Sequence, residues 1–403
     1  MYKILYQGVD TLDVAIKGAL PQPILDELEA AKVEAEKMLS DKQGYGVTLG
    51  PDKLKLFVKA TGMRGGYRYV FIDDPTGAIW SVKANTNPDD WNFFVSARAL
   101  GLLCKTYDGM KAHMESMLKS LGAQIKEVSV NRIDYAIDIA ATNFELDMRN
   151  FVAPGVAKLR AYYSTDNELD DIGNRAPKDK QDHIGAVMSG GRFESVTIGK
   201  MPGRQVIVYD KLKAAKDLKT PYWFDVWGID PSDPCTQVWR VEIRGGKEAL
   251  DRFILKAQHR NYETIEAALP KFLVKATDNI RYVTDKGEVS NVTRSNVHPL
   301  WVAAQQALEA LPERLEPALP QAYALEQMRK ERVTMAIAQG FGNLNNLFVL
   351  EGYTPEEITK HYPQMLAKEA REYGEALGKD LHLEKLAKAK EKLGVFLSSE
   401  MPR

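Results

Sequence analysis

The sequence is poor in cysteine and has no long apolar run. Its 403 residues include two cysteines, Cys104 and Cys235, which stand far apart with no metal-binding partners beside them. The pattern therefore argues against a disulfide framework and a zinc site, and we expect both thiols to be buried. No apolar run approaches the ~20 residues of a membrane-spanning helix, and segment 1–14 lacks the pattern of a secretory signal. We expect a cytoplasmic protein that does not bind membranes.

A large net charge of one sign is also absent. The formal net charge of −1 argues against a protein that coats nucleic acid nonspecifically, so any contact with DNA must depend on local charge. Such an excess lies between residues 192 and 220, where seven basic residues face three acidic ones, and a moderately basic stretch follows at 240–260. A region suited to phosphates is the functional interpretation, and solvated charged faces are the alternative.

The arrangement of apolar residues predicts an α+β fold. Runs of alternating apolar and polar residues predict strands at residues 2–7, 54–60, 67–72, 79–83, 127–139 and 239–244, and two more strands on either side of a turn at 199–203. Polar segments predict surface loops at 164–182 and 227–234. Helical spacing predicts helices at residues 23–39, 108–121, 302–310, 322–338 and 365–393. Because the two kinds of element do not alternate regularly, we expect a mainly antiparallel sheet with helices packed on it. The expected divisions are 1–90, 91–285 and a helical C-terminal domain at 286–403.

Charged residues alternate with apolar ones along the predicted strand at 130–139. Successive side chains of a strand point to opposite faces, so Arg132, Asp134 and Asp138 share one face while isoleucines occupy the other. Two carboxylates on a strand with a buried reverse side form an oxygen-ligand site suited to Mg²⁺ or Mn²⁺. The alternative is a salt-bridge ladder in which Arg132 neutralises both acids.

The predicted strand at 239–244 has the same design. Arg240, Glu242 and Arg244 lie on one side of it, and apolar residues lie on the other. If this strand neighbours the strand at 130–139, Glu242 joins Asp134 and Asp138 as a third oxygen ligand of a divalent ion.

A tyrosine closes the second strand of the hairpin around residues 199–203. Tyr209 follows an apolar strand, with Lys200, Arg204 and Lys211 close to it in sequence. These cations are expected to gather phosphate and to lower the cost of forming phenolate, whose unperturbed pKa is ~10. A tyrosine taken alone is more often a core or surface residue than a nucleophile.

Together these segments resemble the transfer-type replication initiators, the Rep_trans or replication initiation factor family of rolling-circle plasmids, phages and integrative elements. The resemblance covers about residues 90–255 and is carried by the segments 94–103, 132–138, 197–211 and 239–244. It implies an architecture similar to that of the HUH endonucleases, with carboxylates in place of the histidine pair. The six histidines of this chain indeed include no His-hydrophobic-His triplet.

The resemblance also implies a role for each matching residue. Tyr209 is the nucleophile, and Lys211 and Arg204 stabilise charge on the phosphate. The implied ligands of Mg²⁺ or Mn²⁺ are Asp134, Asp138 and Glu242, and the implied DNA-binding residues are Arg132, Lys200, Lys213, Arg240 and Arg244. Family members often carry a glutamate shortly after the Tyr-x-Lys element, whereas this chain has Ala214, Ala215 and Lys216 there, so the ligands are expected on the two strands.

The implied activity is nicking and rejoining of one DNA strand at an origin through a covalent 5′-phosphotyrosine, with residues 91–285 as the nicking domain. The expected partners are single-stranded or hairpin origin DNA, a host helicase and a second copy of the chain. Two alternatives remain open. A conjugative relaxase would nick a transfer origin with the same chemistry, and a nonenzymatic initiator would use Asp134, Asp138 and Glu242 as structural ion pairs.

Overall fold

The described part of the chain builds a single large antiparallel sheet. The computed structural model describes residues 2–37, 44–153, 184–254, 259–284, 294–311, 317–378, 383, 385–387 and 389. In these ranges eleven strands form the sheet in the order β2-β3-β4-β5-β6-β1-β7-β12-β11-β10-β9, and β13 pairs with β8 in a small second sheet. The strands are β1 (Lys3–Ala19), β2 (Tyr45–Leu49), β3 (Leu54–Val58), β4 (Tyr69–Ile72), β5 (Ala78–Val82), β6 (Trp91–Arg98), β7 (Gln124–Ala141), β8 (Phe151–Val152), β9 (Ile184–Ser189), β10 (Arg192–Gly199), β11 (Arg204–Asp210), β12 (Gln237–Gly246) and β13 (Arg281–Tyr282).

Helices connect and cover these strands. They are α1 (Gln22–Lys37), α2 (Ala99–Ser120), α3 (Lys211–Asp217), α4 (Tyr222–Trp227), α5 (Lys247–Phe253), α6 (Tyr262–Asn279), α7 (Pro299–Glu309), α8 (Gln321–Leu350) and α9 (Pro355–Leu377), with a short 3₁₀ turn at Met148–Asn150. The predicted α+β class and antiparallel sheet are confirmed. The predicted loop at 164–182 lies outside the described residues.

Two predicted elements were too short. The first strand was predicted to end at residue 7, but β1 continues to Ala19 and pairs with both β6 and β7. Its register against β7 shifts at four places, one of them between Val9 and Thr11. Such bulges interrupt the alternation of side chains, which is why the sequence pattern did not show the whole strand. The helix predicted from residue 108 begins at Ala99, before a break at Thr106 (φ 66°).

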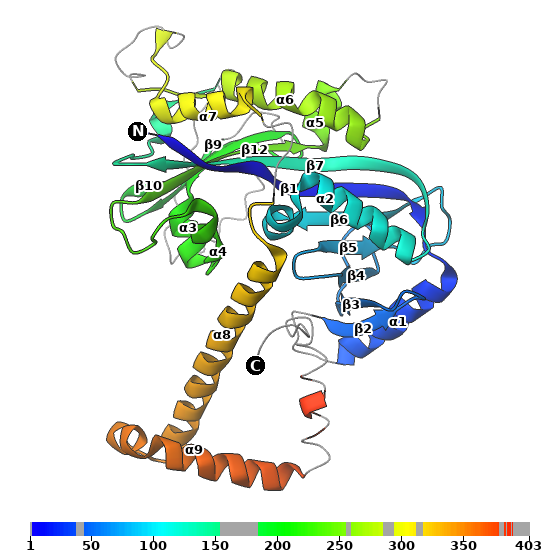
Figure 1. Ribbon diagram of the computed structural model, residues 1–403, viewed down its shortest axis with the longest axis vertical. Helices are drawn as coiled ribbons and strands as arrows, with labels where there is room; N and C mark the ends of the chain where they lie inside the picture. Colours follow the sequence, from blue (N-terminus) through cyan, green and yellow to red (C-terminus); the bar gives the residue numbers. More distant parts are fainter. Residues whose placement is uncertain are drawn as a thin grey trace, which may run out of the picture.

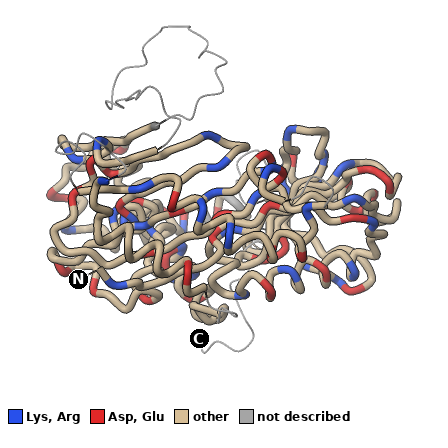
Figure 2. The backbone as a smooth tube through the Cα atoms, turned by 90° about the horizontal axis from the view of Figure 1, so that it is seen from above, with Lys and Arg blue, Asp and Glu red and all other residues tan. Residues whose placement is uncertain are grey.

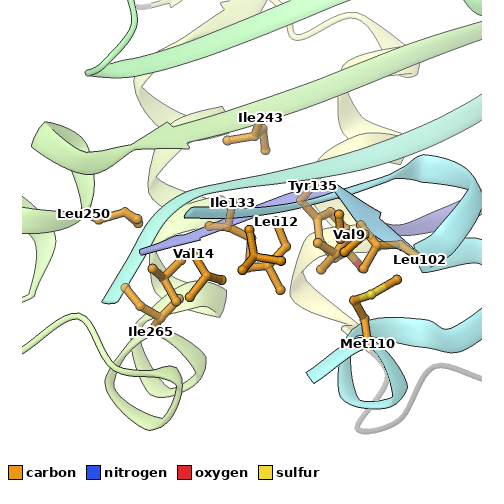
Figure 3. Packing of buried hydrophobic residues seen from close by; sticks show 14 of the residues in the cluster. Val9, Leu12, Val14, Leu102, Met110, Ile133, Tyr135, Ile243, Leu250 and Ile265 are labelled. Carbon is orange, nitrogen blue, oxygen red and sulfur yellow. The ribbon is translucent and has the colours of Figure 1, made fainter. Parts of the chain in front are cut away.

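The core lies on one face of the sheet. Leu12 and Val14 of β1, Ile133 and Tyr135 of β7 and Ile243 of β12 are all buried and belong to one apolar cluster. Met110 of α2, Leu250 of α5 and Ile265 of α6 pack against them, as Figure 3 shows. The helices α1, α2, α5, α6 and α7 therefore cover this face, and the charged side chains of the central strands point to the opposite face.

The last helices differ in how they contact the sheet. The predicted boundary at 285 falls before α7, yet Leu300, Trp301 and Ala304 of α7 are fully buried in the core shared with the sheet. In contrast, α8 extends away from the sheet and α9 crosses its far end (Figure 1). The division into domains remains a prediction.

Charge is mixed along the fold, and the two cysteines differ in exposure. Basic and acidic segments are interspersed over the whole backbone, as Figure 2 shows. Cys104 is buried, as expected, whereas Cys235 is exposed because it lies in the turn that precedes β12. Among the helices described here, none has the length and apolarity needed to cross a lipid bilayer.

Candidate active site

The face opposite the core brings the predicted site residues together. Strand β12 lies between β7 and β11, so the predicted neighbourhood of the two charged strands is confirmed. In the paired register Arg240 stands opposite both Asp138 of β7 and Tyr209 of β11. Directly paired residues of antiparallel strands share a face, so these three side chains form one row across the sheet.

The centre of this row is a buried ion network around Arg240, whose side chain is completely buried. Its Nε and Nη2 donate to the two carboxylate oxygens of Asp138 at 2.5 and 2.8 Å, and its Nη1 donates to Asp10 at 2.5 Å. Trp227 Nε1 donates to Asp138 Oδ2 at 2.9 Å. Both oxygens of Asp138 are therefore already bonded, and removing one partner of such a buried pair is strongly destabilising.

The phenol of Tyr209 contacts the next charged group along β12. Tyr209 is partly buried, and its hydroxyl donates a hydrogen bond of 3.2 Å to Oε2 of the buried Glu242. Arg244 Nε donates to Oε1 of the same carboxylate at 2.6 Å and lies 3.7 Å from Asp134. Asp134 also accepts from Arg132 at 2.5 Å. A chain of alternating charges thus runs from Tyr209 to Arg132.

The ionisation of Tyr209 differs from the prediction. Burial raises the pKa of Tyr209 well above its ordinary value, and Arg240 opposes this shift only in part. Arg204 begins β11 and Tyr209 is its penultimate residue, so the two lie about 17 Å apart at the usual rise per residue. Lys200 lies in the same turn, beyond the end of β10. The expectation that Lys200 and Arg204 surround the phenol is therefore wrong, because the extended strand separates them from it.

Lys211 is the cation that does lie beside Tyr209. Its Nζ is 5.8 Å from the centre of the Tyr209 ring and 4.5 Å from the centre of the Trp223 ring. Arg240 also lies over Trp223, at 4.5 Å. Within the described chain no carboxylate lies within 4 Å of Lys211 Nζ. Burial, together with repulsion from Arg240, lowers the pKa of Lys211 to about 8.

The three predicted metal ligands do not converge on one point. Asp134 and Asp138 are four residues apart on a regular stretch of β7, which separates their Cα atoms by about 13 Å. Burial raises the pKa of Asp134 to about 6, against the opposing effect of Arg132. Nowhere in the described ranges are three or more histidine, cysteine or acidic side chains grouped to hold a metal ion. Arginines occupy the acids, so this arrangement does not fit one ion bound by all three, and a need for Mg²⁺ or Mn²⁺ stays a prediction.

The remaining predicted DNA-binding residues lie around the edge of this row. Lys213 of α3 forms ion pairs with Asp217 at 2.6 Å and Glu194 at 3.4 Å and is 44% exposed. Arg132 and Arg244 are partly exposed above their acids. Arg240, in contrast, is completely buried and contacts no solvent, so its predicted direct contact with DNA is replaced by a contact with Asp138.

Four residues of the site were not predicted. Asp10 enters through the irregular register of β1. Trp223 lies beside both Lys211 and Arg240, and the rings of Tyr6 and Trp227 pack against Trp223. Trp223 and Trp227 belong to the segment Tyr222–Trp227, where tryptophans four residues apart share one face of a helix. That spacing was the available signal for the two tryptophans. Asp10 offered none, because its role depends on a bulge.

Comparison with known proteins finds only weak structural similarity. No protein-family profile matches the chain, and no curated protein matches it. Among solved structures, the chain is similar to a rolling-circle replication initiator protein from Geobacillus stearothermophilus, at 13% identity over 78% of this chain and 99% of that chain. The TM-score is 0.36, which is too low to support a conclusion about fold or function.

Proposed function

We propose that the protein is a rolling-circle DNA replication initiator that nicks and rejoins one strand at an origin through a 5′-phosphotyrosine at Tyr209. The observation that carries this proposal is the hydrogen bond from the Tyr209 hydroxyl to the buried carboxylate of Glu242, beside the cations Lys211 and Arg240. A tyrosine, a proton acceptor and fixed positive charge are the groups that phosphoryl transfer to a phenol requires.

The proposed step transfers the scissile phosphate from a 3′ oxygen to Tyr209. The Tyr209 oxygen attacks the scissile phosphorus while its proton passes to Glu242, and the bond from phosphorus to the 3′ oxygen breaks. The departing oxygen takes up a proton and becomes a 3′ hydroxyl that can prime synthesis. Because the pKa of Tyr209 is raised, phenolate is not present beforehand, and proton transfer must accompany attack. Reversal of the same step reseals the strand.

The charges of the site support binding of a phosphate. Four acids, Asp10, Asp134, Asp138 and Glu242, are matched by four cations, Arg132, Lys211, Arg240 and Arg244. When Glu242 takes up the proton of Tyr209, the network gains one positive charge. This charge favours the developing negative charge of the phosphate in a site of low dielectric constant.

The test is formation of a covalent adduct with a labelled single-stranded origin hairpin. We expect a protein-linked oligonucleotide from the wild type and from the control Tyr373→Phe, whose ring is exposed on α9, but none from Tyr209→Phe. Glu242→Gln should slow the adduct about 10²- to 10⁴-fold, the usual contribution of a positioned base. Mapping of the adduct to a different tyrosine would falsify the assignment. Parallel reactions with EDTA, Mg²⁺ and Mn²⁺ test the predicted metal requirement.

One observation favours the nonenzymatic initiator as a second candidate. Asp134, Asp138 and Glu242 all accept hydrogen bonds from arginines, as that alternative predicts. If the wild type and all variants bind origin DNA and none of them forms an adduct, the protein is a nonenzymatic initiator and not a nicking enzyme. A conjugative relaxase shares the chemistry and differs in substrate, so the adduct yields on a replication origin and a transfer origin separate the two. A host helicase and a second copy of the chain remain predicted partners.

A further inference from the structure

The face that carries Tyr209 continues over the N-terminal half of the sheet. In the strand register, Arg244 of β12 pairs with Asp134 of β7, Asp134 with Thr11 of β1, and Thr11 with Arg98 of β6. These residues form a second row across four strands, parallel to the row of Tyr209 and Arg240. The helices α3 and α4 pack near the Tyr209 row, at β12 and at the Tyr6 end of β1. Farther along this face, Ile79 and Phe94 are partly exposed and Arg98 is exposed, whereas the small polar side chains between them, Thr11, Ser81 and Ser96, are buried.

The exposed charge of this region is mainly positive. Arg98 is 52% exposed, Arg244 29% and Arg132 24%. The acids that accompany them lie underneath, because Asp13 is 10% exposed and Asp134 is completely buried. The sheet therefore presents guanidinium groups outward and keeps the compensating carboxylates inside, an arrangement complementary to a phosphate backbone.

An aromatic pair lies at the far end of the same face. Phe94 stands opposite Ser81 and Ala15, and its ring centre is 6.2 Å from that of Tyr67. Lys83 Nζ lies 5.3 Å from the centre of the Tyr67 ring. Both rings are partly exposed. Partly exposed rings beside cations on a sheet are the elements that proteins use to stack the bases of single strands.

We propose that this face, from Tyr67 and Phe94 across Arg98, Arg132 and Arg244 to Tyr209, is the track on which single-stranded DNA lies while one phosphate is at the active site. The inference rests on the proposed function, since it assigns the path of that substrate. Four strand spacings across the sheet and nine residues along it separate Phe94 from Tyr209, a distance of about 35 Å. Single-strand sites on OB folds, which hold about 4–16 nucleotides, reach such a length.

Binding of a fluorescent oligothymidylate of 16 residues to the full chain tests the track, with Tyr209→Phe as the common background to prevent reaction. Phe94→Leu keeps an apolar side chain in place but removes the stacking ring, and should weaken binding about 5- to 100-fold. Arg98→Ala should weaken it about 3- to 10-fold and reduce the dependence of log Kd on log salt by about 0.7. Thermal unfolding of each variant checks that the fold is intact.

The controls carry the same chemical changes elsewhere. Lys271→Ala removes an exposed cation of α6 on the opposite side of the sheet, and Tyr373→Ala removes an exposed ring of α9. Both should bind as the background protein does. Equal Kd values for Arg98→Ala, Phe94→Leu and these controls would overturn the track, and so would tighter binding of a duplex of the same length. Loss of binding in the track variants without any adduct in the wild type would refute nicking while leaving the track in place.

Discussion

At the scale of single residues, the site is a set of buried charges that hold one another in place. Arg240 is the central member, bonded to Asp138 and Asp10 and lying over Trp223. Burial of ions costs free energy, which only well-placed partners offset. Lys211 lacks a close carboxylate in the described chain and is stabilised by the ring of Trp223 instead. Keeping its ammonium group charged in the folded protein therefore costs free energy.

The free-energy cost of burying the Lys211 charge can be measured with the substitution Lys211→Met. The pKa of Lys211 is lowered to about 8, so at pH 7 the folded protein must keep a charge that the unfolded chain carries more easily. Removing it should raise the free energy of unfolding by about 3 kcal/mol at pH 7, and this gain should disappear above pH ~10.5, where both states are neutral. Urea unfolding at the two pH values measures the difference.

A matched control separates charge burial from a general effect. Lys213→Met changes a lysine that is 44% exposed, and should alter the free energy of unfolding by less than ~0.5 kcal/mol. If Lys211→Met destabilises the protein at pH 7, burial of the Lys211 charge does not lower the free energy of unfolding. The Lys211→Met variant should also form the DNA adduct more slowly, since it lacks the cation beside Tyr209.

At the scale of elements, the hairpin of β10 and β11 determines where Tyr209 points. Gly199 ends β10 with φ +93°, and a Cβ atom there would lie 2.1 Å from the carbonyl oxygen of Arg204. Only glycine allows the two strands to approach so closely at this end. The register that follows sets Tyr209 opposite Ser195 on one side and Arg240 on the other.

The substitution Gly199→Ala should therefore disturb the site from a distance. The positive φ alone costs about 1–3 kcal/mol, and the clash with Arg204 adds to it. We expect a lower urea midpoint and a slower adduct, because the strand must shift to admit the methyl group. Gly185→Ala on β9 is the control, since a Cβ at Gly185 meets no atom within 4 Å. Similar losses in both variants would show that the close approach of the strands at Gly199 is not the cause.

At the scale of the whole molecule, the sheet and its helices bury two apolar clusters, whereas most of α8 lies outside both. Ala324, near the start of α8, and Leu319 are buried in the same apolar cluster as Trp223. Farther along, Val333, Met335 and Ile337 are all about half exposed. The helix then contacts α9, where Phe341 stacks on Tyr362 at 5.0 Å.

Truncation tests this difference. A chain that ends after Lys330 keeps Leu319 and Ala324, so we expect an unchanged melting temperature for the sheet and normal adduct formation. A chain that ends after Ala318 loses two buried members of the Trp223 cluster, Leu319 and Ala324, and should unfold at a lower urea concentration, with a loss of about 2–5 kcal/mol. If the chain that ends after Lys330 is also unfolded, the rest of α8 and α9 are required for the stability of the sheet.

Buried tyrosines make the whole fold sensitive to high pH. Burial raises the pKa values of Tyr6, Tyr107, Tyr135 and Tyr262 above the ordinary ~10. Above that pH the unfolded chain loses protons that the folded chain retains, so the free energy of unfolding should fall by up to ~1.4 kcal/mol per pH unit for each tyrosine. Urea midpoints at pH 8 and pH 11 measure this fall. Tyr135→Phe removes a buried hydroxyl that has no hydrogen-bond partner among the described residues, and it should reduce this fall.

The sequence alone determined the local features of this protein. Alternation along residues 130–139 and 239–244 correctly placed Arg132, Asp134 and Asp138 together on one side of their strand, and Arg240, Glu242 and Arg244 together on one side of theirs, because side chains in a strand have a period of two. Glycine and proline marked the hairpin before Tyr209, and helical periodicity indicated α1, the second half of α2, α7 and parts of α8 and α9, but not α6. These features depend on neighbouring residues and can be read from them.

Only the tertiary structure decided which charges meet. Arg240 and Asp138 are 102 positions apart in the sequence, and Arg240 and Asp10 are 230 apart. Pairing of β12 with β7 and the bulge in β1 bring these side chains together, and local alternation encodes neither. Burial raises the pKa of Tyr209, whereas the sequence had predicted that nearby cations would favour the phenolate. The acids bond to arginines instead of grouping around one ion. Desolvation depends on everything packed around a group, and not only on its neighbours in sequence.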